Sequence, residues 1–407
     1  MIHWYKFKNF YSYKDDTFVD MSLKKNSPET DYDFTYYGKK FSKVMAVMGA
    51  NASGKSNLLR PLAFLSWFCG NSFKDQEKND PLPLYPHKLA QNEPTELEIC
   101  FSLPMFKEEN VMFKYSVILN TKIVLMENLK IKLGSSHFKN AFKREYKNGK
   151  YNIKVNPAYD NEKAFPADEI KLVPSNISTI SYLSRKDALW AKAIDKMFNT
   201  IFTNLFVHGK TSFNYRRVLQ SAENYFNNPE LFNIAINIIK QMDCGIIDIK
   251  LKEEEFIDSD SGDVTKKIIP YAIHDSDNGE FEMPFILESS GTQALFSFML
   301  PLLFALSVGG LAVMDEIDSD LHPLMVLSIL SLFENKETNK HNAQIIFSCH
   351  TPEILKRLKK HHVYLVEKEN SVSESWRLDD IIGLRSQDNL YSKYMTGALG
   401  GVPDIDL

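Results

Sequence analysis

One short segment combines small, cationic and hydroxyl residues at a spacing suited to binding phosphate. Residues 49–56 read GANASGKS, which fits the pattern G-x-x-x-x-G-K-[S/T] in full. In such a loop the glycines let backbone N–H groups surround a phosphate, and a lysine and a hydroxyl complete the site. A strand-like run, VMAVM, precedes the loop and a helix-like run, NLLRPLAFL, follows it. Motif and context together predict a nucleotide-binding loop.

Lys55 is expected to reach the β- and γ-phosphates, and the Ser56 hydroxyl to ligate Mg²⁺. ATP and Mg²⁺ are therefore the predicted cofactors. The alternative is a glycine-rich turn that matches by accident, which at average residue frequencies happens in about one or two such chains per hundred. The residues predicted to contact the nucleotide here are Gly49, Asn51, Ser53, Gly54, Lys55, Ser56 and Asn57.

Two carboxylates follow a second apolar run. Leu311–Met314 reads as a buried strand, and Asp315 and Glu316 come directly after it. A strand followed by an acidic turn is common by itself. Downstream of a phosphate loop, however, we expect Asp315 to hold Mg²⁺ and Glu316 to polarise the attacking water as a general base.

A third apolar run, Gln344–Cys349, ends in His350. A histidine at such a strand end can hydrogen-bond the γ-phosphate or hold the attacking water. A solvated or structural histidine is the other interpretation, and spacing alone does not separate the two.

A small polar cluster, SSGTQ at residues 289–293, stands before a strongly apolar helix-like run. A helix cap explains part of it, because Ser and Thr oxygens accept hydrogen bonds from the first-turn N–H groups. Capping needs only one such residue. Ser290 and Gly291 could also present a hydroxyl, a backbone N–H and a helix N-terminus to a phosphate.

In this order, the loop, SSGTQ, MDEIDSDLHP and the strand ending in His350 resemble the heads of ABC-type ATPases, the branch with SMC, RecF, RecN and OLD-like proteins. More narrowly, these motifs resemble a bacterial group of stand-alone AAA/ABC-type ATP-binding proteins. That group is associated with abortive infection and anti-phage systems. The resemblance covers about residues 1–130 and 285–403.

The resemblance implies an α/β P-loop NTPase fold of ABC-ATPase type that hydrolyses ATP to ADP and phosphate. Two heads would enclose two ATP molecules in a homo-oligomer that is at least a head-to-head dimer. Ser290 and Gly291 would then contact the γ-phosphate bound to the partner's loop, and Asp318 would take part in the site. An effector protein is the further partner that the resemblance implies.

The sequence departs from the family pattern at the signature residues and at the Q-loop. Ser289 and Thr292 replace the leucine and the second glycine of Leu-Ser-Gly-Gly-Gln, as happens in the OLD-like group. No glutamine stands clearly in the family's Q-loop position, and Gln91 is the nearest candidate. OLD-type nucleases add a metal-dependent domain after the head, but only about forty residues follow Glu367, so we expect no nuclease activity.

The elements that must position these residues suggest three segments within an α/β chain with a β-rich lobe. Residues 1–160 are predicted to form an N-terminal ATPase lobe with the loop and an antiparallel β subdomain. Residues 161–242 read as a helical insertion, and residues 243–407 as the C-terminal ATPase lobe. At 407 residues the chain is long enough for two or three such parts.

A nucleic-acid partner has only local support. The formal net charge is −4, so there is no global basic footprint. Residues 130–154 carry seven lysines, Arg144 and a single acid, with aromatic residues between them. This segment could bind nucleic acid, which would suit a DNA-repair-type head, but the solvated face of a β ribbon is favoured. Residues 356–362, KRLKKHH, are predicted to end a helix, where cations complement the dipole.

The remaining composition favours a cytoplasmic protein. Residues 294–314 contain no charged side chain and are long enough to span a bilayer. Gly309 and Gly310 divide them, however, so we predict a buried helix, turn and strand and no membrane partner. The four cysteines lie far apart, without metal-binding spacing, which suits reduced thiols.

Overall fold

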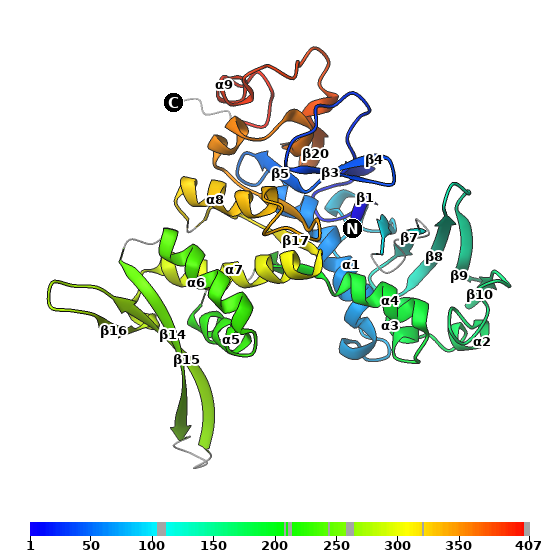
Figure 1. Ribbon diagram of the computed structural model, residues 1–407. Coiled ribbons are helices and arrows are strands. Elements are labelled where there is room, and N and C mark those ends of the chain that lie inside the picture. Colours follow the sequence, from blue (N-terminus) through cyan, green and yellow to red (C-terminus); the bar gives the residue numbers. More distant parts are fainter. Residues whose placement is uncertain are drawn as a thin grey trace.

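The computed structural model describes residues 1–103, 111–206, 209–210, 214–242, 245–257, 264–319 and 321–402 (Figure 1). It contains a central sheet, a β lobe on one side of it, and helices with a β ribbon on the other side.

The central sheet has six strands in the order β11-β17-β18-β5-β19-β20, and all but β20 run parallel. Every residue of β17, β18 and β5 is buried. Parallel strands covered on both faces need such continuous apolar runs. The strands are β5 (Val44–Gly49), β11 (Ile201–Thr203), β17 (Leu311–Met314), β18 (Gln344–Ser348), β19 (Val363–Glu369) and β20 (Val372–Arg377).

Helices cover both faces of this sheet. Along β5, Met45 and Val47 pack into the core that contains α1 (Lys55–Asp75), whereas the alternate residues pack into the other core. This alternation follows from the period of two in a strand. The second core contains α7 (Ser290–Val308) and α8 (Pro323–Glu334).

The β lobe is a seven-stranded antiparallel sheet in the order β10-β9-β8-β7-β6-β1-β2. It packs on α1 together with α3 (Thr179–Ser184) and α4 (Leu189–Phe198) in one continuous core. Its strands are β1 (Ile2–Lys8), β2 (Thr17–Asp20), β6 (Thr95–Ser102), β7 (Val111–Leu119), β8 (Val124–Leu133), β9 (Lys139–Lys147) and β10 (Lys150–Val155).

The segment expected to be a helical insertion does contain helices, but it also supplies β11 to the central sheet. Three residues are too few to show strand periodicity in a helical context. Its remaining elements are α2 (Ala167–Ile170), the short β12 (Leu205–Phe206) and β13 (Gly209–Lys210), α5 (Tyr215–Phe226) and α6 (Pro229–Met242).

A β ribbon projects away from the body below α5 and α6 (Figure 1). It consists of β14 (Ile246–Ile257), β15 (Val264–His274) and β16 (Phe281–Pro284), all antiparallel. The one-turn element η3 (Phe285–Leu287) then leads into α7. The smaller elements are β3 (Asp33–Tyr36), β4 (Lys39–Ser42), η1 (Lys88–Ala90), η4 (Pro352–Lys356), η5 (Lys360–His362), η6 (Leu378–Asp380) and α9 (Leu390–Met395).

The apolar segment after Ser290 forms the predicted helix, turn and strand. Within the described residues, α7 is the one helix long and apolar enough to cross a membrane. It packs instead against α5, α6, β11 and β17. Burial inside the domain therefore accounts for its apolar composition.

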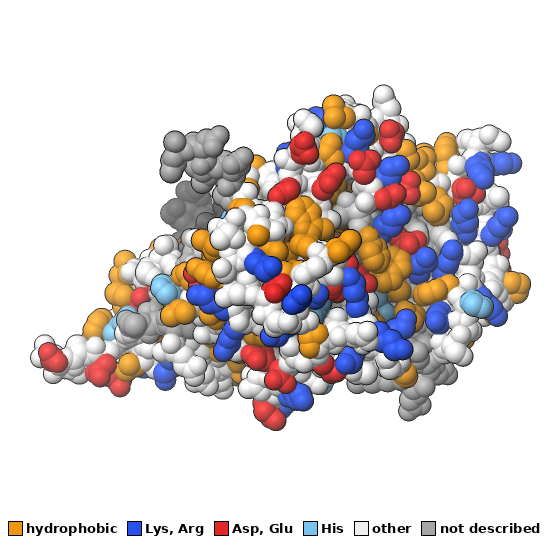
Figure 2. All heavy atoms as spheres, turned by 90° about the horizontal axis from the view of Figure 1, so that it is seen from above, with side chains coloured by type: hydrophobic (Ala, Val, Ile, Leu, Met, Phe, Trp, Pro, Cys, Tyr) orange, Lys and Arg blue, Asp and Glu red, His pale blue; other side chains and the backbone are white. Residues whose placement is uncertain are grey.

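The basic segment of residues 130–154 is only partly a surface. Arg144 is fully buried and its guanidinium lies 2.9 Å from the Glu127 carboxylate, which is also fully buried. Glu127 in turn accepts hydrogen bonds from Tyr115, Ser178 and Thr179, so the pair joins β8 and β9 to the start of α3. Arg144 therefore has a structural role. Figure 2 shows Lys and Arg side chains on the side of the β lobe, mixed with acidic and apolar ones.

Residues 356–362 were predicted to end a helix, and they end two short 3-10 helices, η4 and η5, and no α-helix. His361 and His362 are buried. The Nε2 atom of His362 lies 2.9 Å from Asp33 Oδ1, and that of His361 lies 3.3 Å from Asp33 Oδ2. The two histidines thus join the C-terminal lobe to β3, a long-range contact that no local pattern reveals.

Candidate nucleotide site

The phosphate loop lies between the end of β5 and the start of α1, where a helix N-terminus favours anions. A Cβ on Gly49 would lie 2.3 Å from the carbonyl oxygen of Val366, and one on Gly54 would lie 2.3 Å from Ser373 Oγ. Gly54 also has a φ of 117°. Both positions therefore require glycine, because β19 and β20 approach the loop too closely for a side chain.

Lys55 lies inside the loop. Its Nζ donates hydrogen bonds to the carbonyl oxygens of Gly49 and Ala50, both at 2.9 Å. Burial lowers the pKa of Lys55, while Asp315 and Glu316 act in the opposite direction. The ammonium group is thus held where phosphate oxygens would replace the carbonyls as acceptors.

Ser56 and Asp315 meet across the site as the sequence predicts for a metal-binding pair. Ser56 Oγ donates to Asp315 Oδ1 at 3.0 Å, and Ser348 Oγ donates to the same oxygen at 2.5 Å. A hydroxyl and a carboxylate are ligands that Mg²⁺ accepts beside water and phosphate oxygens. The Ser53 hydroxyl, also in the loop, is buried and makes no hydrogen bond within the described residues. These residues fit a bound Mg²⁺–nucleotide.

Glu316 begins a strained turn directly after β17. Its φ is 48°, and its backbone N–H donates to Ser348 Oγ at 2.7 Å. A non-glycine residue in this region costs roughly 1–3 kcal/mol and persists only where its surroundings hold it. Ser348 therefore contacts both predicted acidic residues, a role that the sequence interpretation missed.

Asn204 is a second missed residue. It follows β11, is buried, and its side chain binds the backbone of Asp315 on both sides. Its Nδ2 donates to the Asp315 carbonyl at 2.9 Å, and its Oδ1 accepts from the Asp315 N–H at 2.7 Å. Gln91, the weak Q-loop candidate, is exposed at the end of η1. The only sequence signal for Asn204 was its position, as a polar amide directly after the short run of residues 201–203.

Asp318 and His350 are joined, but through the backbone. Asp318 Oδ2 accepts hydrogen bonds from the His350 N–H at 2.8 Å and from Thr351 Oγ1 at 2.7 Å. His350 itself is exposed. The structure therefore places Asp318 as the residue that holds the turn carrying His350.

Three hydroxyl and amide side chains support the loop from behind. Asn57 Nδ2 donates to Ser12 Oγ at 2.8 Å. Ser373 Oγ donates to the Ser53 carbonyl at 2.5 Å, and it is hydrogen-bonded to Ser12 Oγ at 2.8 Å. Asn57, predicted to contact the nucleotide, is thus directed toward the β1–β2 connection. Ser12 and Ser373 come from opposite ends of the chain, so spacing could not relate them.

The SSGTQ cluster is a helix cap, and its described contacts are local. Ser289 Oγ accepts from the Thr292 N–H at 3.1 Å, and Gln293 Nε2 donates to the Glu288 carbonyl at 2.8 Å. Ser290 is exposed. Figure 1 shows the start of α7 beside β16 and α6, on the side away from α1. The fold does not bring Ser290 and Gly291 to the phosphate loop of the same chain.

Asp33, His361 and His362 lie close enough together to hold a metal ion. Their hydrogen bonds argue against one, because His362 Nδ1 accepts from the Lys359 N–H at 3.0 Å while Nε2 faces Asp33. Asp33 Oδ2 also accepts from Thr30. Burial opposes charge on Asp33, but the histidine hydrogen bonds outweigh it and lower its pKa. The cluster is structural.

One family model matches the chain over residues 44–356, and its description is "AAA domain, putative AbiEii toxin, Type IV TA system". The match includes the phosphate loop, β17 and β18 with the residues around them. None of the curated proteins matches the chain.

Solved ATPase heads align with the chain at low identity. The Smc head domain of Pyrococcus furiosus, bound to the C-terminal domain of ScpA, is 14% identical with a TM-score of 0.42, covering 93% of this chain and 96% of that one. The Smc head of Pyrococcus yayanosii is 13% identical with a TM-score of 0.45, at 98% and 99% coverage. The recombination mediator RecF-ATPrS is 12% identical with a TM-score of 0.40, at 92% and 98% coverage.

Proposed function

We propose, from the premise that this chain belongs to the family described as AAA domain, putative AbiEii toxin, Type IV TA system, that it binds and hydrolyses ATP. The observation that carries the proposal is a set of hydrogen bonds at one carboxylate oxygen of Asp315. The sequence predicts Asp315 and Ser56 as site residues, and the structure adds Ser348. Ser56 from the loop and Ser348 from β18 both donate to Asp315 Oδ1. This brings loop, metal ligand and strand end into one site.

Hydrolysis would use these residues mainly for positioning and charge stabilisation. The loop N–H groups and Lys55 bind the phosphates. Ser56 and Asp315 would hold Mg²⁺, which when bound would supply positive charge beside the phosphates. Glu316 accepts a proton from the attacking water, and His350 orients that water or the γ-phosphate. Ser348 and Asn204 fix the turn from which both acidic side chains extend.

The same proposal includes an ATP-dependent head-to-head dimer. Ser290 is exposed and Gly291 is partly buried at the start of a 19-residue helix, the end of α7 that lies away from α1 in Figure 1. Beside them Ile286 and Leu287 are 53% and 66% exposed. Apolar side chains next to a helix N-terminus suit contact with a second subunit, where Ser290 would reach the partner's γ-phosphate.

The biological role we propose is that of a cytoplasmic sensor or scaffold ATPase that controls an effector protein in a bacterial anti-phage system. Support comes from the resemblance of the motifs and from the family description, which names a putative AbiEii toxin. A DNA-repair-type head is the second candidate, since Lys147, Lys150 and Lys154 are exposed on adjacent strands of the β lobe. DNA stimulation of hydrolysis that Lys147→Gln weakens would favour that candidate.

The test is the mass of the purified protein by light scattering with and without Mg-ATP, with phosphate release recorded on the same samples. The Glu316→Gln variant should bind ATP, accumulate as the larger species and release phosphate slowly. The Ser290→Arg variant should stay at the smaller mass. The dimer would be contradicted if the mass stayed constant with Mg-ATP and the Ser290→Arg variant released phosphate as fast as the parent. The assignment of Glu316 as the base would be contradicted if Glu316→Gln turned over ATP as fast as the parent.

A further inference from the structure

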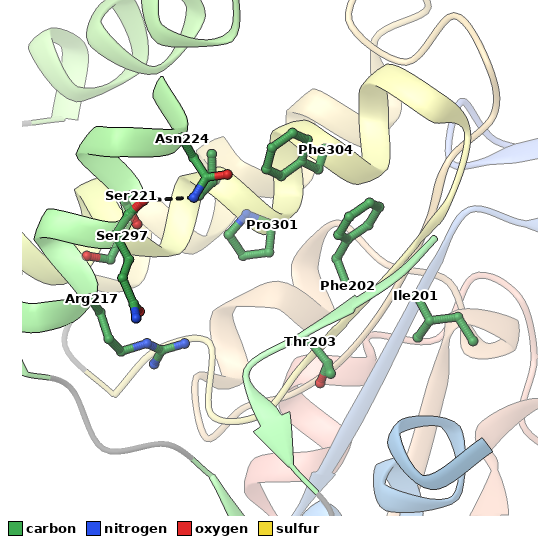
Figure 3. Close-up of a pocket in the computed structure, with 11 residues that line it drawn as sticks. Ile201, Phe202, Thr203, Arg217, Ser221, Asn224, Ser297, Pro301 and Phe304 are labelled. Carbon is green, nitrogen blue, oxygen red and sulfur yellow. Dashed lines mark hydrogen bonds between the residues drawn. The ribbon is translucent and has the colours of Figure 1, made fainter. Parts of the chain in front are cut away.

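A groove of about 360 Å³ lies between β11, α5 and α7, apart from the phosphate loop (Figure 3). Its residues take no part in the proposed hydrolysis. One side is the outer edge of the central sheet, and the other two sides are helices. The groove combines apolar, polar and cationic groups.

The edge strand leaves backbone groups available. Within the central sheet β11 pairs only with β17. The Leu311 N–H donates to the Thr200 carbonyl at 3.0 Å. In a parallel pair every second residue directs its backbone N–H and C=O groups to the neighbouring strand, so Phe202 faces β17. Ile201 and Thr203 therefore direct their backbone groups outward. Among the described residues, no hydrogen bond reaches these outward groups. An unpaired edge of this kind is a template for another strand.

The α7 side offers an apolar surface and a further acceptor. The rings of Phe202 and Phe304 stack with centroids 5.6 Å apart, and Pro301 lies beside them in Figure 3. Pro301 has no N–H, so the Ser297 carbonyl one turn earlier lacks its helical donor. Both residues line the groove.

The α5 side supplies a positive charge. Arg217 extends from α5 toward Thr203 in Figure 3 and is half-buried, and this burial lowers its pKa. A cation placed near an unpaired strand edge favours a segment that carries a carboxylate. Gln220 and Asn224 add amide groups along the same helix.

We propose that this groove binds an extended segment of a partner protein, which adds as a strand beside β11. An apolar side chain of the segment would contact Phe202 and Phe304, and an acidic side chain would pair with Arg217. Main-chain hydrogen bonds would supply affinity and the alternate side chains specificity. Asn204, which holds Asp315, follows β11 directly, so the docked strand would adjoin the nucleotide site. The inference rests on the proposed function in one respect only, namely that the bound segment belongs to the effector protein.

The probe is a library of random ten-residue peptides displayed on phage, selected on the full chain without nucleotide. Enriched peptides should alternate apolar residues with an acid. Arg217→Glu should weaken their binding at least tenfold, whereas Arg216→Glu, on the exposed neighbour, should not. Thr203→Pro removes an outward N–H without removing a bond to β17, and its control Thr203→Ala keeps that N–H. Binding should fall for the proline variant alone.

Hydrogen exchange separates strand addition from other binding. The amides of Ile201 and Thr203 should become protected when an enriched peptide is added. No enriched peptide, equal binding to all four variants, or continued exchange at both amides would overturn the inference. Light scattering with Mg-ATP on the same variants tests the proposed function separately. Normal assembly of Arg217→Glu would show that this variant is folded. If the parent chain failed to assemble but still bound the peptide, the proposed dimer would be contradicted and the strand-binding groove would not.

Discussion

At the scale of single residues, the site depends on side chains that hold the backbone as much as on those that would touch ATP. Asn204 makes two hydrogen bonds to the backbone of Asp315. Ser348 contacts the carboxylate of Asp315 and the N–H of Glu316. The acidic pair is recognisable in the sequence because it follows an apolar run. Its supports come from other strands, so no spacing rule connects them to it.

Asn204→Ala should therefore weaken the site without touching a nucleotide-binding group. Two buried hydrogen bonds are lost and a buried N–H is left unpaired, which costs about 1–3 kcal/mol of unfolding free energy. ATP hydrolysis should fall roughly tenfold, at about 1.4 kcal/mol per decade, and should need more Mg²⁺ for half-maximal rate. Measurement of phosphate release against Mg²⁺ concentration checks this. Gln91→Ala is the control, and an equal loss in both variants would contradict the assignment.

At the scale of elements, buried charges connect parts of the chain that are remote in sequence. The Glu127–Arg144 pair is fully buried and joins two strands of the β lobe to α3. The arginine also donates to the carbonyl oxygens of Val173, Pro174 and Ile177. From sequence, Arg144 is one cation in a basic segment. Only the fold shows that it lies inside the lobe while its neighbouring lysines lie outside.

Arg144→Met should destabilise the protein strongly, because Glu127 would remain as a buried charge without its cation. The expected loss is about 3–5 kcal/mol in the free energy of unfolding, measured by urea titration. Lys147→Met, at an exposed position on the same strand, should change it by less than about 0.5 kcal/mol. Equal stability of the two variants would show that the buried pair is not needed.

The contact between β3 and η5 should make stability depend on pH. Burial lowers the pKa of His362 from 6.5 to about 4, so the folded state binds fewer protons than the unfolded state between these values. The contribution of neutral His362 to the free energy of unfolding is therefore complete above pH 6.5. This free energy falls by up to about 3 kcal/mol as the pH falls toward 4. Urea unfolding of the parent and of His362→Gln at pH 7 and pH 5 tests this. The variant should show a smaller difference between the two pH values.

At the scale of the whole molecule, the sequence predicts the α/β class and the strands that carry the loop, Asp315 and His350, because each combines an apolar run with a polar end. The three-segment division stays a prediction, and the structure shows why that boundary is hard to draw. Ile201–Thr203 lies among helices in the chain but pairs with β17. A three-residue strand is defined by its neighbours in space, as are the contacts of Asp33, Ser12 and Ser373.

The arrangement of the two candidate phosphate-contacting surfaces leads to a final prediction about assembly. In the proposed function Ser290, next to the exposed Leu287 at the start of α7, acts on the nucleotide of a partner, so a complete site would require two chains. Leu287→Glu should place a charge in that interface, and ATP-dependent mass increase should be lost. Binding of a fluorescent ATP analogue should stay within about twofold of the parent, since Leu287 does not contact the loop's own nucleotide.

The matched control for Leu287→Glu is Leu189→Glu, because Leu189 is similarly exposed, at 58% against 66%, but begins α4 next to the β lobe. It should assemble as the parent does. If both variants assembled normally, the apolar residues before α7 would have no part in a dimer. If both failed, general loss of stability would be the simpler cause, and urea unfolding of each would show it. Loss confined to Leu287→Glu would locate the subunit contact at the start of α7, where Ser290 could act on a partner's ATP.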